Sequence, residues 1–136
     1  MLTLNAAIAR VKRQKIEEFA GESFVHRDEV VKKIPNLKGC QGQQFLFGIY
    51  YSEGYWTVLS VNYLYASFDG ELATLRLDTE ADKIYDYFGV EGNDFSSEIH
   101  LKDGRRFWMK SPELASLVLN IMMMLKNVPC GTVLKE

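Results

Sequence analysis

The chain has 136 residues, of which 47% are apolar and 25% are charged, with a formal net charge of −2 and two cysteines. These values are typical of one folded domain, and they exclude a disordered chain, a disulfide framework and a globally basic nucleic-acid-binding protein. No run reaches the roughly 18 consecutive apolar residues of a membrane span, and the first residues lack the order of a signal peptide, so we expect a cytoplasmic protein.

Residues 1–36 predict a helical preface that packs on the rest of the chain. Apolar residues recur at helical spacing in the first helix, predicted over 3–20: Leu4, Ile8, Val11 and Phe19. Lys15 interrupts this stripe. A second helix is predicted over 24–34, because Pro35 disfavours helical geometry in the residue before it.

From residue 44 the pattern changes to short aromatic and β-branched runs separated by turn residues. Seven strands are predicted: 45–51, 55–61, 63–68, 73–77, 84–88, 98–101 and 105–110. This spacing indicates an antiparallel barrel or sandwich. The α+β chain is therefore divided into the preface, a β-rich domain over 44–127 and a tail over 128–136.

The last predicted hairpin allows its register to be chosen from its apolar residues. A two-residue turn at Asp103-Gly104 would mix apolar and polar side chains on each face. A three-residue loop, with Gly104 in the left-handed conformation, places four apolar side chains on one face: Ile99, Leu101, Phe107 and Met109. Trp108 then lies on the opposite face, beside His100.

A helix is predicted over 112–126, since Ser111 is a good N-cap and Pro112 suits the first helical position. Its main apolar stripe contains five residues: Leu114, Leu117, Val118, Ile121 and Leu125. Leu119 and Met123 point away from that stripe. We expect both to be covered, either by the first helix or by a second copy of the chain.

Seven short strands followed by one amphipathic helix resemble the pleckstrin-homology superfold, in its GRAM and bacterial PH-like branches. The resemblance covers about 44–127 and is carried by GYWTVLSVNYLYASFDGE (54–71) and IHLKDGRRFWMKSPELASLVLNI (99–121). It implies a seven-stranded barrel closed by the last helix. Relatives that bind phosphoinositides use basic residues in the loop between the first two strands, whereas this chain has Glu53 there, which argues against that ligand.

The sequence shows no catalytic, metal-binding or cofactor motif, so we expect a non-enzymatic binding or regulatory module. The predicted partner is a protein or peptide, including a second copy in a homodimer, docked on four residues: Trp108, Leu119, Met122 and Met123. Two other classes stay open. One is an oligomerising structural protein, and the other is a small enzyme whose site is assembled from scattered residues.

Overall fold

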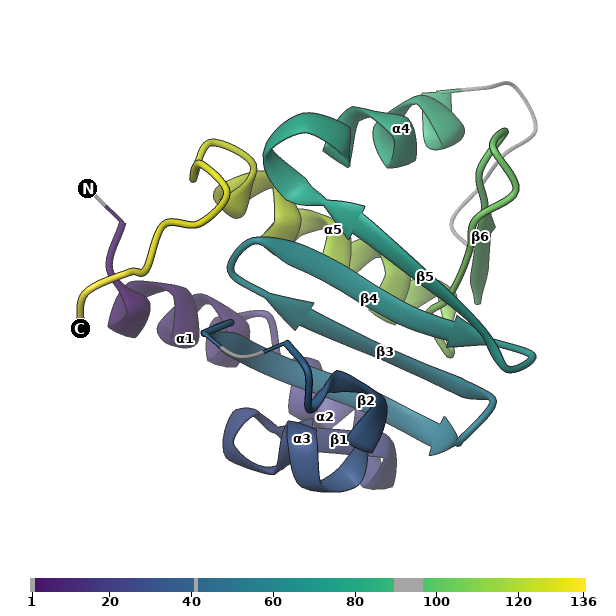
Figure 1. The fold of residues 1–136 in the computed structure, drawn as a ribbon, viewed down its shortest axis with the longest axis horizontal. Helices are drawn as coiled ribbons and strands as arrows, with labels where there is room; N and C mark the ends of the chain where they lie inside the picture. The colour runs from purple at the N-terminus through teal and green to yellow at the C-terminus, as the bar shows by residue number, and fades with distance from the viewer. Residues whose placement is uncertain (1, 41, 90–96) are drawn as a thin grey trace.

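The structure is a computed structural model that describes residues 2–40, 42–89 and 97–136; of 86–89 it describes the backbone only. It has α+β architecture, with N-terminal helices, one antiparallel sheet, a separate hairpin and a C-terminal helix (Figure 1). No helix in these ranges combines the length and the apolar character that a membrane crossing needs.

The sheet contains five strands in sequence order: β1 (Phe24–His26), β2 (Phe45–Ser52), β3 (Tyr55–Ser60), β4 (Tyr63–Phe68) and β5 (Glu71–Arg76). The hairpin consists of β6 (Glu98–His100) and β7 (Arg106–Trp108). The longer helices are α1 (Leu4–Arg13), α2 (Ile16–Ala20), α4 (Leu77–Gly89) and α5 (Pro112–Leu125). Short helical turns flank β1 and lead to β2: η1 (Gly21–Ser23), η2 (Arg27–Glu29), α3 (Val30–Lys33) and η3 (Pro35–Leu37).

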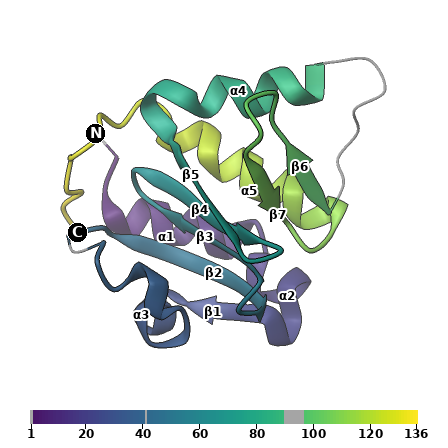
Figure 2. The ribbon, with the colours of Figure 1, turned by 45° about the vertical axis from the view of Figure 1, so that its right-hand side comes forward.

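Each face of the sheet has its own apolar core. Four residues paired across β2 to β5 form the centre of the main face, and all are fully buried: Phe47, Leu59, Leu64 and Leu75. This core is shared with α1, α2, α5 and the hairpin. The opposite face carries Trp56 and Val58, which pack beneath the segment that contains α3 and η3. Figures 1 and 2 show α5 and α3 on different sides of the sheet.

Gly48 allows β1 to join the sheet. A Cβ added at this position would lie 3.2 Å from the Cβ of Val25 in β1 and 3.3 Å from a methyl carbon of Val58 in β3. A larger residue would require these valines to shift by a few tenths of an ångström, whereas glycine lets β1 pack against β2 as it stands.

Several predicted elements are confirmed. The meander 45–76 forms as expected, and α5 begins after Ser111, whose hydroxyl accepts a hydrogen bond from the Leu114 amide at 3.2 Å. The hairpin has the predicted three-residue loop, because Ile99 pairs with Phe107 and Gly104 has a φ of 96°.

Other predictions are wrong. The helix expected over 3–20 is two helices, because Lys15 adopts a left-handed φ of 58° between them. Residues 24–34 form β1 and short turns, since Val25 pairs with Gly48 of β2. The strand expected over 84–88 belongs to helix α4. The described strands form an open sheet and a separate hairpin, with no closed barrel among them.

Candidate functional site

Five aromatic side chains form a continuous row where the β6–β7 hairpin meets one end of the sheet. In spatial order they are Tyr51, Trp108, Tyr55, Phe68 and His100, and we call them the aromatic row. Successive ring centroids lie 6.3, 6.4, 5.6 and 5.5 Å apart, which is the range of favourable tilted and edge-to-face contacts. Tyr51, at one end of the row, is 72% exposed.

Turn positions and strand register bring the row together. Tyr51 and Tyr55 flank the turn between β2 and β3, and Tyr55 pairs with Phe68 across β3 and β4. The three-residue hairpin loop turns Trp108 and His100 away from the buried side of β6 and β7. The hydroxyl of Thr57 donates a hydrogen bond to the Trp108 carbonyl, which attaches the hairpin to the sheet.

Charges of both signs border the row. The Arg106 guanidinium carbon lies 4.5 Å from the centre of the Phe68 ring, and its Nη2 lies 3.5 Å from an oxygen of Glu71. His100 Nε2 lies 2.9 Å from an oxygen of Glu98. These contacts place hydrogen-bonding groups at the rim of the row, beside its aromatic rings.

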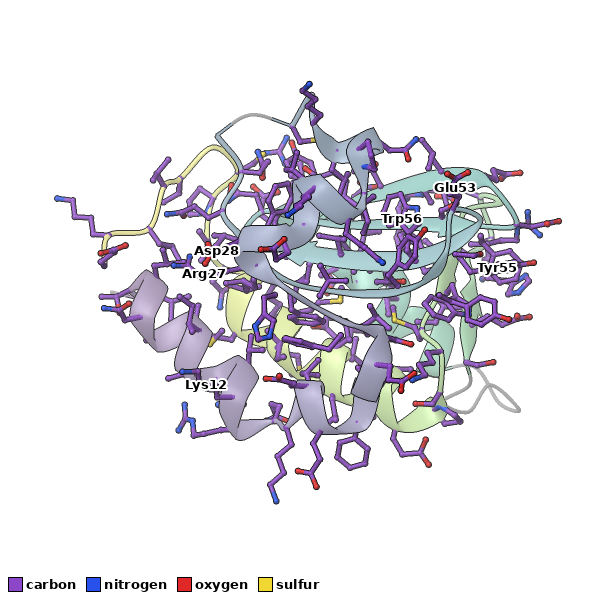
Figure 3. The ribbon with its side chains drawn as sticks, turned by 90° about the horizontal axis from the view of Figure 1, so that it is seen from below. Lys12, Arg27, Asp28, Glu53, Tyr55 and Trp56 are labelled. Carbon is purple, nitrogen blue, oxygen red and sulfur yellow. The ribbon has the colours of Figure 1, made fainter. Side chains whose placement is uncertain are left out.

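Tyr51 also lines a groove of about 670 Å³ beside β1, so the groove and the row share this one side chain. Its walls include all of β1, the side chains of Lys32 and Lys33, and Tyr50. The Lys33 ammonium lies 4.8 Å from the centre of the Tyr50 ring. Figure 3 shows Tyr55 at the end of the molecule away from Lys12, Arg27 and Asp28.

The structure does not gather the four predicted partner-binding residues into one surface. Trp108 lies in the aromatic row and is partly buried. Met122 is fully buried, so it is not available to a partner, and Leu119 is partly buried against the main core. Met123 is 52% exposed, but it lies far from Trp108 along the chain. Trp108 precedes α5, and Met123 lies eleven residues after the first residue of this helix, or about 16 Å along its axis.

The expectation that Met123 is covered within the chain is therefore wrong, because half of its surface is exposed. Coverage by a second copy stays a prediction. The sequence interpretation also missed Tyr51, Tyr55 and Phe68 as site residues. Their position next to the turns at 52–54 and 69–70 could have indicated them, because aromatic side chains at strand ends often lie outside the core.

Other polar side chains of the described regions serve local contacts. Tyr63 Oη lies 3.0 Å from Cys130 Sγ, and this hydrogen bond raises the pKa of Tyr63. Burial raises the pKa of Tyr65, its neighbour on the same face of β4. Across residues 2–40, 42–89 and 97–136, no cluster of three or more histidine, cysteine or acidic side chains has the arrangement of a metal site.

No protein-family model, curated protein or solved structure matches this chain, so the geometry of the aromatic row is what supports a function.

Proposed function

We propose that this protein is a non-enzymatic binding module that docks an extended peptide segment of a protein partner on the aromatic row. The observation that carries this proposal is that one exposed side chain, Tyr51, both contacts Trp108 in the row and lines the groove beside β1. The proposed site includes Trp108, as the sequence predicted. In place of the three predicted residues of α5, it contains the aromatic rings beside the turns.

The chemistry of the row suits a peptide. Aromatic rings held by a rigid sheet provide a large apolar contact area with little loss of side-chain entropy on binding. Tyrosine and tryptophan are enriched among the residues that dominate protein interfaces. Arg106 and Glu71 at the rim offer a donor and an acceptor to a peptide backbone or to polar side chains.

The arrangement also supports the resemblance to the pleckstrin-homology superfold as part of this proposal. Strands β2 to β5 form a meander, the β6–β7 hairpin packs on it, and α5 follows, which is the order that the resemblance implies. Helix α4 occupies the position where a fifth strand was expected. A distant member of that superfold with one strand replaced by a helix fits these observations.

Selection from a displayed peptide library against the full chain tests this function. The selected peptide should lose about tenfold or more in affinity when Tyr51 is replaced by serine, since an anchor ring at an interface is worth 1 to 2 kcal/mol or more. Because Tyr51 is 72% exposed, this replacement should leave the unfolding midpoint unchanged. Affinity is measured by fluorescence anisotropy.

Leu72→Ser is the matched control. Leu72 is 57% exposed and lies on the other face of β5 from the row, because its buried neighbours Ala73 and Leu75 point into the main core. The selected peptide should bind this variant as it binds the unaltered chain. Equal affinity for the Tyr51→Ser variant, or a library that yields no binding peptide, would contradict the proposal.

A further inference from the structure

Side chains at the end of the sheet opposite to the aromatic row bind the backbone of residues 130–134. Gln44 precedes β2, and Asn62 lies between β3 and β4. Gln44 Nε2 donates to the Leu134 carbonyl at 2.8 Å, and the Leu134 amide donates to Gln44 Oε1 at 2.7 Å. One carboxamide thus makes the same pair of hydrogen bonds to Leu134 that a residue of a neighbouring strand would make.

Asn62 makes two similar hydrogen bonds, but to two successive residues, Gly131 and Thr132. The Gly131 amide donates to Asn62 Oδ1 at 2.8 Å, and Asn62 Nδ2 donates to the Thr132 carbonyl at 3.3 Å. Asn62 is 5% exposed, so these bonds satisfy a buried carboxamide. The Cys130 amide adds a third contact by donating to Asp78 Oδ2 at 2.9 Å.

One side chain anchors the segment. Leu134 is 5% exposed and belongs to the main core, whereas Val133 is 66% exposed. Adjacent side chains pointing in opposite directions are typical of an extended peptide lying on a surface. The segment belongs to no strand of the sheet. The two carboxamides and the buried leucine hold residues 131–134, and the contacts of Cys130 with Asp78 and of Lys135 with Leu4 lie on either side.

We propose that Gln44, Asn62 and the apolar site of the Leu134 side chain form a peptide-binding site, the carboxamide site, which residues 130–134 of the same chain occupy. Carboxamides that contact only backbone groups accept many sequences, and the buried position selects an aliphatic side chain. In the bound segment the Thr132 amide donates to the Pro129 carbonyl at 3.1 Å, and Gly131 has a positive φ of 87°, so its first residues form a turn. The ligand class is therefore a peptide with a glycine turn at the position of Gly131, followed by an extended stretch with leucine three residues after the glycine. The chain's own segment competes with such a peptide, so the site opens only when this segment leaves.

The test uses full chains and a fluorescein-labelled peptide with the sequence of residues 128–136. In the Leu134→Asp variant, a carboxylate replaces the buried anchor and should release the segment. The peptide should bind this variant saturably and at least about tenfold more tightly than it binds the unaltered chain, whose own segment competes. Anisotropy reports binding, and circular dichroism reports folding.

Two controls isolate the contacts. A peptide whose leucine is replaced by aspartate should bind the Leu134→Asp chain at least about tenfold more weakly. Adding Gln44→Met to that chain removes one carboxamide at similar length and should weaken binding of the original peptide by a similar factor. Adding Tyr51→Ser to the Leu134→Asp chain should leave its affinity for this peptide unchanged. The outcome for the carboxamide site is therefore independent of whether the aromatic row binds a peptide.

If the Leu134→Asp chain does not fold, the same titration uses Leu134→Ala, which weakens the anchor without burying a charge. Binding that does not depend on the leucine of the peptide overturns the proposal. Failure of both variants to fold also overturns it, because a site that collapses without its own segment cannot accept another peptide. An unaltered chain that is dimeric, and that Leu134→Asp converts to a monomer, overturns it in favour of segment exchange between copies.

Discussion

Two adjacent methionines of α5, Met122 and Met123, occupy opposite environments. Met122 is fully buried and Met123 is 52% exposed. Apolar side chains cover most of the circumference of α5, because the helix packs against the sheet in the main core and also contacts α2 and α4. Methionine fills such irregular contacts well, since its side chain is long and flexible. The position of each side chain around the helix therefore decides its role.

Replacing each methionine by lysine should give very different results. Met122→Lys places an ammonium group in the core and should lower the free energy of unfolding by about 3 to 5 kcal/mol. Met123→Lys should change it by no more than about 0.5 kcal/mol, because the side chain already reaches solvent. Urea denaturation measures both values. A large loss of stability in Met123→Lys would show that a second copy covers this residue.

At the scale of elements, an ion pair covers part of the outer edge of β5, the last strand of the sheet. Arg105 Nη1 donates to the Thr74 carbonyl at 2.7 Å, and the Arg76 amide donates to Glu80 Oε1 at 3.1 Å. Arg105 Nη2 and Glu80 Oε2 lie 2.7 Å apart. The pair satisfies two backbone groups that an added strand would otherwise bind, and it connects α4 to the hairpin loop.

This pair predicts how stability depends on pH. The hydrogen bond from Arg105 lowers the pKa of Glu80 from 4.5 to about 2. Because the folded pKa is the lower one, the stabilising effect is fully present above pH 4.5 and is lost as the pH falls toward about 2. At pH 7, Glu80→Gln should therefore be less stable than the unaltered chain by about 1 kcal/mol, allowing for screening of a partly exposed pair.

Urea denaturation between pH 7 and pH 2 checks this prediction. The difference between Glu80→Gln and the unaltered chain should shrink as the pH falls and vanish near the lowered pKa. Glu22→Gln alters an exposed acid of η1 and should show no such convergence. A difference that stays constant with pH would mean that the Glu80 charge contributes nothing to stability.

The elements that the sequence predicts well are those whose signals are local. Ser111 and Pro112 mark the start of α5, and alternating apolar residues determine the register of the last hairpin. Trp108 was placed on the correct face by that register. The rest of the aromatic row depends on contacts between β2, β3, β4 and the hairpin, which no local pattern reveals.

Two of the three mistaken elements, the strand expected over 84–88 and the helix expected over 24–34, have different causes. In α4, Leu77, Ala81 and Ile84 are buried at helical spacing, but the aromatic residues that follow favour a strand. The helical spacing of the buried residues indicates the correct structure, whereas the strand propensity of the aromatic residues indicates the wrong one. Strand β1 has three residues and forms by pairing with β2, so its existence depends on a distant segment rather than on its own sequence.

At the scale of the whole molecule, the N-terminal helices share one core with α5. Five of their residues belong to the main core and are buried: Leu4, Ala7, Val11, Ile16 and Ala20. Lys110 Nζ donates to the Ala20 carbonyl at 2.6 Å, and the Leu4 amide donates to the Lys135 carbonyl at 2.8 Å. These contacts predict that residues 1–36 unfold together with the sheet, and not as a separate unit.

Ile16→Ala tests this cooperativity. Ile16 is fully buried, so its truncation should lower the free energy of unfolding of the whole chain by about 2 to 4 kcal/mol. Tryptophan fluorescence reports on the sheet through Trp56 and on the aromatic row through Trp108, while circular dichroism also reports on the helices. The curves from both probes should shift together in urea and remain superimposable. Val31→Ala, at a position that is 38% exposed, should shift them by much less. An early loss of helical signal in Ile16→Ala, with the tryptophan transition unchanged, would show that the N-terminal helices are a separate folding unit.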